Sequence, residues 1–344
     1  MSAVHVAVDA QNLTRDDRGI GRYARAVLSR AVRDPGFRWT FVVRDLFPKR
    51  AALARAVGAE SEPVVARRVP RDADVVWFPW NGIALRTDAP SVATVHDAAP
   101  FAFPAASARL RATEQNPFLA TANTARRILV QSRFTASEVE RWLGVDAARI
   151  VVTPLAADPV FSPRAPANDE LPRELRGKRY VLHVGAHDER KNTATLIAGF
   201  ERAFPRGGMT LAFTRAPRPL PRGAVVASAR DDGALAALYR GAALVAVPST
   251  YEGFGFPLLE ALACGAPVLA ARAGALPEVG GDAAAYVDEP ADPDAWARAL
   301  RALLDNDAAR ARLAAAGPRR AAEFSWERCT AQTLGVLREV ASLR

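Results

Sequence analysis

Two carboxylates stand eight positions apart in the segment 252–260, Glu-Gly-Phe-Gly-Phe-Pro-Leu-Leu-Glu. The apolar run 244–247 before it predicts a buried strand. A helix is expected to begin around Pro257, because proline suits the first helical turn. Glu252 would then lie in the turn at the carboxyl end of the strand, with Glu260 about one turn inside the helix. Ligands of open α/β sheets bind at that end of the strands, so both carboxylates are candidates for ligand binding or chemistry.

The turn itself adds hydrogen-bond donors. Gly253, Phe254 and Gly255 would present backbone N–H groups beside a helix N-terminus, which favours an anion. Each carboxylate has a purely structural reading when taken singly, Glu252 as a solvated turn residue and Glu260 as a partner of the helix dipole. Their combination with the Gly-Phe-Gly turn favours a ligand site.

Two cations follow another predicted strand, which ends at Gly185. Arg190 and Lys191 precede a helix for which Asn192 or Thr193 is a plausible N-cap. Two cations beside the positive end of a helix form a diphosphate site on physical grounds. The structural alternative is a solvated charged loop.

Polar and aromatic residues also follow two strands in the first half of the chain. Residues 74–78 lead into Trp80 and Asn81, and residues 91–95 lead into His96 and Asp97. His96 is a candidate site residue, with backbone bonding in a closed loop as its alternative. Asp97 is more consistent with an orienting or loop-closing neighbour. Trp80 could wall an acceptor pocket, although packing is the commoner role of such an aromatic residue.

A glycine loop near the N-terminus fits two readings. Residues 19–24 formally fit the dinucleotide fingerprint G-x-G-x-x-G/A, with Asp45 about twenty residues on. About ten polar residues separate the first strand from Gly19, whereas the fingerprint needs a tight strand-to-helix turn. The better interpretation is a loop in which Gly19 and Gly21 let the backbone approach a phosphate or an acceptor.

Strand and helix patterns alternate through both halves of the chain, which predicts two doubly wound α/β domains. We expect an N-terminal domain over 1–158, a proline-rich linker over 159–176 and a C-terminal domain over 177–324. An amphipathic helix over 325–344 completes the chain. Thr135 and Glu138 fit a capping box for one helix of the first domain.

Composition limits the class of protein. The 344 residues carry a net charge of +9 and two cysteines, which predict neither a disulfide framework nor a metal cluster. Without a stretch of eighteen apolar residues, neither a transmembrane helix nor a signal peptide is expected, and a cytoplasmic location follows. The arginines are dispersed without interleaved aromatics, so weak affinity for anionic lipid is a more reasonable expectation than nucleic-acid binding.

The segment 244–279 resembles the signature of retaining, GT-B-fold glycosyltransferases of family 4, and the resemblance covers nearly the whole chain. It implies two Rossmann-like domains facing across a cleft, with the last helix crossing back to the first domain. It also implies a cytoplasmic enzyme that could associate peripherally with the inner face of the membrane. Several relatives have arginine where this chain has Ala186, so phosphate binding would lean on Arg190 and Lys191.

The resemblance implies a role for each candidate residue. Glu252 and His96 would be catalytic-site residues that hold the donor sugar, and Glu260 would bind the ribose. The base would lie against the backbone of 228–230. The other implied sets are the donor diphosphate residues Arg190, Lys191, Gly253, Phe254, Gly255, Gly19 and Gly21, the base-binding Ser228, Ala229 and Arg230, and the acceptor-side candidates Trp80, Asn81 and Asp97.

The expected reaction is metal-independent transfer of a hexose, without a cofactor, to a saccharide, lipid-linked or small-molecule hydroxyl. GDP-mannose is the first guess for the donor, and UDP-glucose is close behind. Whether Glu252 is a nucleophile or an electrostatic stabiliser stays open. The competing readings are an NAD(P)-dependent oxidoreductase built on residues 19–24, a nucleic-acid-binding protein, and a GT-B enzyme that is not a transferase.

Overall fold

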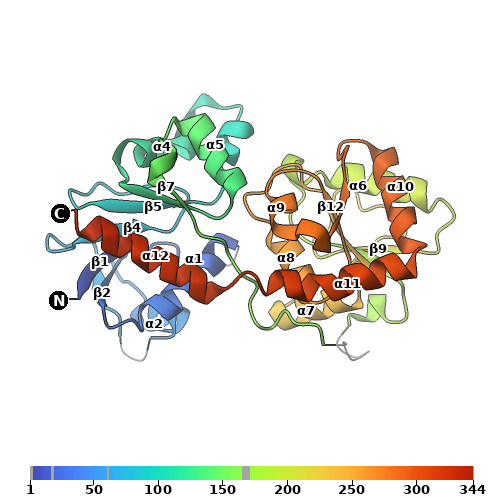
Figure 1. Ribbon diagram of the computed structural model, residues 1–344, viewed down its shortest axis with the longest axis horizontal. Coiled ribbons are helices and arrows are strands. Elements are labelled where there is room, and N and C mark those ends of the chain that lie inside the picture. Colours follow the sequence, from blue (N-terminus) through green and yellow to red (C-terminus); the bar gives the residue numbers. More distant parts are fainter. Residues whose placement is uncertain (1–2, 17–18, 60–61, 165–170, 344) are drawn as a thin grey trace. The chain divides into compact units, whose positions relative to one another are not determined.

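The computed structural model describes residues 3–16, 19–59, 62–164 and 171–343 (Figure 1). The chain forms two compact units: residues 1–155 with 325–344 make unit 1, and residues 156–324 make unit 2. Residues 165–170 of the expected linker 159–176 lie outside the described residues.

Unit 1 is built on a parallel sheet in the order β3-β2-β1-β4-β5-β6-β7, seven strands over the described residues. The strands are β1 (Val4–Asp9), β2 (Phe37–Val42), β3 (Val65–Ala66), β4 (Val75–Phe78), β5 (Ser91–Val95), β6 (Arg127–Val130) and β7 (Ile150–Val152). Every residue of β4 and β5 is buried, as in a sheet that is covered on both faces. The strand order reverses between β1 and β4, and such a reversal is the usual ligand site of an open α/β sheet.

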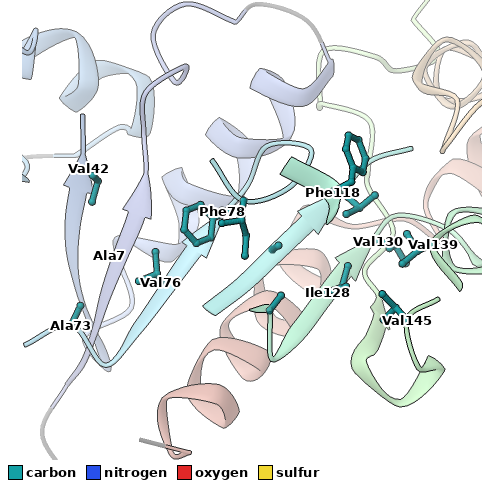
Figure 2. Close-up of a cluster of buried hydrophobic side chains, with 14 residues drawn as sticks. Ala7, Val42, Ala73, Val76, Phe78, Phe118, Ile128, Val130, Val139 and Val145 are labelled. Carbon is teal, nitrogen blue, oxygen red and sulfur yellow. The ribbon is translucent and has the colours of Figure 1, made fainter. Parts of the chain in front are cut away.

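Helices cover both faces of this sheet. They are α1 (Gly19–Ala31), α2 (Arg50–Val57), α3 (Ala99–Ala102), α4 (Ala108–Thr124), α5 (Arg133–Leu143) and α12 (Trp326–Ala341), with the 3-10 turn η1 (Ala147–Arg149). Figure 2 shows the core on one face, where Phe78 and Ile128 of the strands belong to one cluster with Phe118 of α4 and Val139 of α5. The side chain of Trp77, the residue before Phe78, lies on the opposite face of the sheet and packs edge-on against Tyr23 of α1.

The last helix, α12, belongs to unit 1 although unit 2 precedes it in the chain. Cys329, Leu337 and Val340 are fully buried on its inner side. Ion pairs join Glu327 to Arg30 of α1 at 2.9 Å and Glu339 to Arg127 of β6 at 2.5 Å. The expected return of the chain to its first domain is confirmed.

Unit 2 contains a second parallel sheet in the order β10-β9-β8-β11-β12-β13. Its strands are β8 (Tyr180–His183), β9 (Thr210–Phe213), β10 (Val225–Val226), β11 (Leu244–Val247), β12 (Val268–Ala271) and β13 (Ala285–Val287). The helices are α6 (Thr193–Ala203), α7 (Asp232–Gly241), α8 (Phe256–Ala263), α9 (Leu276–Gly280), α10 (Pro293–Leu304) and α11 (Asp307–Ala321), with the 3-10 turns η2 (Arg173–Leu175), η3 (Glu189–Lys191) and η4 (Gly281–Ala283). The order reverses between β8 and β11, so the loops after these two strands flank the ligand position of the sheet.

The structure corrects one helix start. The N-cap of α5 is Ser132, whose hydroxyl accepts a hydrogen bond from the Thr135 backbone at 3.0 Å. Thr135 is therefore the third helical residue, and the capping box predicted for it is wrong. Glu138 instead accepts a hydrogen bond from the Trp142 indole at 2.9 Å.

No helix within the described residues is both long and apolar enough to cross a membrane.

Candidate active site

The strand reversal of unit 2 brings a carboxylate and two cations together. Lys191, at the end of η3, donates a hydrogen bond to Glu252 in the loop after β11. Arg190 lies with its guanidinium 4.0 Å from the other oxygen of the same carboxylate and 3.4 Å from Asp188. The Glu252 side chain is 10% exposed and that of Lys191 is 14% exposed. The sequence predicted these residues at strand ends, and the structure brings them into one partly buried ion-pair network.

Hydrogen bonds join the loop after β8 to the loops after β11 and β13. Asn192 adopts a left-handed conformation with φ 51°, and its side-chain amide donates to the carbonyl oxygens of Pro248 at 3.3 Å and Pro290 at 2.6 Å. The Thr250 backbone donates to the Arg190 carbonyl at 2.8 Å. Asn192 is the N-cap residue of α6, one of the two predicted positions. Its side-chain oxygen accepts a hydrogen bond from the Thr195 hydroxyl of α6 at 2.6 Å rather than from a helix backbone N–H.

Gly274 packs against the backbone of Glu252, a contact that the sequence did not predict. The Ala275 backbone donates to the Glu252 carbonyl at 2.9 Å. A Cβ atom at Gly274 would lie 2.7 Å from the Glu252 nitrogen and 2.8 Å from its carbonyl oxygen, and φ there is +58°. Only glycine fits this position without displacing the backbone that carries the carboxylate.

The Gly-Phe-Gly turn enters α8 as the sequence predicted. Gly255 is the N-cap residue of α8 with φ 102°, and Pro257 occupies the first turn of the helix. A Cβ atom at Gly255 would lie 2.7 Å from Leu276, so the turn is closely packed. Phe254 is buried between Phe256 and Phe324. The Phe254 ring therefore belongs to an aromatic cluster inside unit 2.

Glu260 lies inside α8 and is 3% exposed. Its carboxylate accepts a hydrogen bond from the Tyr239 hydroxyl of α7 at 2.9 Å, and the Tyr239 ring packs edge-on against Phe161. The structure thus places the second carboxylate deeper than Glu252, in contact with a tyrosine that sequence spacing did not connect to it.

The segment predicted for the nucleotide base follows β10. Ser228 and Arg230 are exposed and Ala229 is partly buried. The Ser228 hydroxyl lies 3.5 Å from the Thr214 carbonyl, and the Arg230 side chain is 90% exposed beside Asp231. These three residues lie in the loop between β10 and α7.

A pair of histidines adjoins the network and was missed by the sequence analysis. His183, the last residue of β8, and His187, in the loop that follows, both contact the Thr193 hydroxyl at the start of α6, at 3.2 and 3.1 Å. Burial lowers the pKa of His183 to about 4. The two histidines are four residues apart, one at the end of β8 and one in the loop after it. The sequence gives no sign that both contact the same hydroxyl, and only the fold shows it.

His96 follows β5 in unit 1 and is 9% exposed. Its backbone N–H donates to the Asn81 side chain at 2.6 Å, and its Nε2 donates to the Pro79 carbonyl at 2.8 Å. Tyr23 packs edge-on against the ring at 4.9 Å. Burial lowers the pKa of His96 to about 4, so the ring is neutral with Nδ1 as its acceptor nitrogen. The structure brings His96 and Asn81 together as direct partners.

Trp80 and Asp97, two other candidate site residues of unit 1, form hydrogen bonds within the protein. Trp80 is 8% exposed, and its indole donates to the Asp9 carbonyl at 2.8 Å, so the packing role fits better than that of a pocket wall. Asp97 accepts a hydrogen bond from the Ala99 backbone at 3.1 Å, as expected of a loop-closing residue.

The glycine loop differs from a dinucleotide fingerprint. β1 ends at Asp9 and α1 begins at Gly19, so no tight turn joins them. A Cβ atom at Gly21 would lie 1.7 Å from the Asp16 carbonyl oxygen, which explains this glycine by close packing. Asp45 accepts hydrogen bonds from Gln11 at 2.9 Å and Arg15 at 2.6 Å, which lower the pKa of its carboxyl.

Across the ranges that the structure describes, no cluster of three or more His, Cys, Asp or Glu side chains could hold a metal ion.

The chain matches two families of known proteins. Residues 4–161 match the family described as Glycosyltransferase Family 4, and residues 220–320 match the one described as Glycosyl transferases group 1.

Two curated relatives transfer mannose according to their names. The O-antigen chain mannosyltransferase B of Escherichia coli is 34% identical over 264 residues, which cover 71% of this chain and 69% of that protein. The MMP alpha-(1->4)-mannosyltransferase of Mycolicibacterium hassiacum is 35% identical over 224 residues, which cover 61% of this chain and 53% of that protein.

Among solved structures, that of Anabaena HepE in complex with UDP-glucose superposes with a TM-score of 0.73 at 16% identity. The similarity covers 97% of this chain and 99% of HepE. At this identity it shows a shared fold, the GT-B arrangement of two Rossmann-like sheets.

Proposed function

Because the chain belongs to glycosyltransferase family 4, we propose that it transfers mannose from GDP-mannose to a hydroxyl group, with retention of the anomeric configuration. It is an enzyme that moves a hexose from a nucleotide sugar. The choice of mannose is supported by the names of the two relatives. UDP-glucose, which HepE binds, is the alternative donor.

The ion-pair network of Lys191, Arg190 and Glu252 is the observation that carries this proposal. Breaking the bond between the sugar and the diphosphate leaves positive charge on the sugar ring and negative charge on the departing phosphate. The network offers cations for the phosphate and a carboxylate for the ring. Fixed charges of this kind stabilise a transition state because they need no rearrangement as the reaction proceeds.

The step we propose keeps the acceptor on the same face of the sugar as the leaving group. The bond between the anomeric carbon and the phosphate oxygen breaks, and its electron pair stays with the diphosphate. The acceptor oxygen forms the new bond, and its proton passes to the departing phosphate oxygen. Glu252 then stabilises the cationic ring without becoming attached to it, and Lys191 and Arg190 hold the product diphosphate.

The remaining roles are proposals of the same kind. Glu260 binds the ribose, and the backbone of 228–230 contacts the base. His96 accepts a hydrogen bond from a sugar hydroxyl through Nδ1, because its Nε2 proton is bound to the Pro79 carbonyl. The N–H groups of 253–255 and the turn at Gly19 and Gly21 contribute to the diphosphate site, and Asn81 acts by orienting His96.

The acceptor is a saccharide or a lipid-linked saccharide in this proposal, and we propose contact with an anionic membrane on its cytoplasmic side. Leu46 and Phe47 are 70% and 89% exposed in the loop after β2. Arg44, Lys49 and Arg50 surround them in the sequence and are exposed as well. Exposed apolar residues flanked by cations suit anionic lipid. Loss of sedimentation with anionic vesicles in Leu46→Ser/Phe47→Ser, with normal donor binding, would support this contact, and unchanged sedimentation would refute it.

Thermal unfolding with a panel of ligands tests the main proposal. The panel contains GDP, UDP, dTDP, ADP, GDP-mannose, UDP-glucose and NAD(P)H. A ligand at a hundred times its dissociation constant stabilises a fold by about 2.7 kcal/mol. We expect GDP and GDP-mannose to raise the Tm, and Lys191→Ala to reduce this shift by about half or more. Stabilisation by NAD(P)H alone would overturn the proposal.

A further inference from the structure

A chain of hydrogen bonds runs from the core of unit 2 to the loop that carries Arg190 and Lys191. His183 Nδ1 lies 3.2 Å from the Ala246 carbonyl oxygen, and its Nε2 lies 3.2 Å from the Thr193 hydroxyl. The same hydroxyl lies 3.1 Å from His187 Nδ1, and His187 Nε2 lies 2.8 Å from the Arg215 carbonyl oxygen.

If both imidazole rings were neutral, they could not form all the hydrogen bonds in this series. Both ends are carbonyl oxygens, so His183 Nδ1 and His187 Nε2 must each carry a proton. In neutral rings the two nitrogens that face Thr193 would then both be acceptors. The Thr193 hydroxyl has one proton and can serve only one of them. One additional proton on either ring lets every contact in the chain form.

The surroundings decide which ring takes that proton. His183 is 2% exposed, and burial lowers its pKa to about 4. His187 is partly exposed on the loop after β8 and packs edge-on against Phe213 of β9. The charge therefore belongs on His187, the ring that water reaches.

We propose that His187 is an imidazolium that positions the donor-diphosphate loop and serves as its third cation. This inference rests on the proposed function, because it assigns a new residue to the same site. His187 donates both N–H groups to the protein, so it acts on the diphosphate through its charge and through the shape of the loop.

The charges around the loop explain why a third cation matters. Arg190, Lys191 and Arg215 are balanced by Asp188, Glu189 and Glu252, and two of the cations already contact these carboxylates. His183 and Thr193, the polar side chains that face His187 from β8 and α6, are neutral. Without His187 the loop offers no excess charge to a diphosphate. A protonated His187 makes the local sum positive, which favours an anionic ligand.

A first measurement needs no ligand. The full chain, labelled with 15N-histidine, is titrated by NMR, and the spectrum of His187→Gln identifies the His187 signals. We expect both ring nitrogens of His187 to be protonated at pH 7, with His183 neutral. A neutral His187 at pH 7 would overturn the inference, whatever the donor of the enzyme is.

A second measurement follows the dissociation constant of GDP-mannose and of UDP-glucose by calorimetry between pH 6 and pH 8.5. A nucleotide sugar has no phosphate group that titrates in this range, so the pH dependence reports on the protein. We expect binding to weaken about tenfold as pH rises, equivalent to about 1.4 kcal/mol. Proton uptake on binding, measured in buffers of different ionisation enthalpy, should vanish in His187→Gln.

Variants separate the charge of His187 from its structural contacts. His187→Gln should bind weakly at every pH, as the wild type does at pH 8.5, and His187→Arg should bind tightly at every pH. His5→Gln, a buried histidine of unit 1, should keep the wild-type pH dependence. An unchanged pH dependence in His187→Gln would contradict the inference. Absence of binding by both nucleotide sugars would instead refute the proposed donor, while the NMR result would still decide the charge of His187.

Discussion

Lys191 and Glu252 form an ion pair across the strand reversal of unit 2. The sequence assigned them separate roles, one on the diphosphate and one on the sugar. In the structure each neutralises the other in a partly buried site. Donor binding must therefore bring a diphosphate to a lysine that already has a carboxylate partner, and the two roles are coupled.

Replacing Glu252 by Gln should affect turnover far more than donor binding. The amide keeps the size of the side chain and removes the charge that faces the cationic sugar ring. Loss of one oriented electrostatic group costs on the order of a hundredfold in kcat. Steady-state kinetics and calorimetry with the donor check this together. A kcat within a few-fold of the wild type would show that Glu252 has no catalytic role.

Replacing Lys191 by Ala should weaken nucleoside diphosphate binding by about tenfold or more, because hydrogen bonds to charged groups contribute about 1.5–3 kcal/mol. Lys178→Ala is the matched control, since Lys178 is an exposed lysine of the same unit. Equal dissociation constants for both variants, measured by calorimetry, would place the diphosphate elsewhere.

Replacing Gly274 by Ala should lower both kcat and the free energy of unfolding of unit 2. The new Cβ atom would press on the Glu252 backbone, and the residue would have to adopt φ +58°. Gly208→Ala provides the control, because Gly208 has φ +90° but nothing within 4 Å of an added Cβ atom. We expect the control to lose about 1 kcal/mol of stability and to keep its kcat. A normal kcat in Gly274→Ala would mean that the support of Glu252 is unimportant.

Acid should destabilise both units before their carboxylates titrate. Burial holds the pKa of His96 and of His183 at about 4 in the folded chain, against 6.5 in the unfolded chain. The unfolded chain therefore binds more protons between these values, and the free energy of unfolding falls as pH falls from 6.5 to 4. Above pH 6.5 this contribution is constant. Urea unfolding across this range should show the slope, and His183→Gln should reduce it for unit 2.

We expect transfer to continue in excess EDTA, because the proposed step stabilises the diphosphate with side chains and backbone amides alone. The assay measures release of nucleoside diphosphate before and after dialysis. Activity that disappears with EDTA and returns with a divalent cation would contradict this expectation.

The sequence predicted the fold and the strand-end positions of Arg190, Lys191 and Glu252, because these depend on patterns along the chain, but it did not predict that the three residues form ion pairs. Apolar runs that end at glycine or proline located the strands, and Arg190, Lys191 and Glu252 followed such ends. Helix α4 escaped prediction because it contains Pro117 and few buried residues, so no apolar stripe marks it. Contacts between residues that lie far apart in the sequence could not be predicted either. Gly274 behind Glu252 is one example.

A second group of residues shows the same limit. The hydroxyl of Thr193 joins two histidines, and Tyr239 holds Glu260, only because the fold brings separate strands and helices together. The Trp80 indole donates a hydrogen bond to the backbone of β1. Its partner could not be named without the sheet order.

The position of α12 has a consequence for synthesis on the ribosome. Trp326, Leu337 and Val340 belong to the interior of unit 1 but are translated only after all of unit 2. Residues 156–324 form one continuous segment, so unit 2 has its whole sequence available before unit 1 does. Residues 1–155 are translated before unit 2, but unit 1 lacks part of its interior until residues 325–344 have been translated. A ribosome-bound chain that stops before residue 325 should therefore leave unit 1 open to proteolysis while unit 2 is already protected.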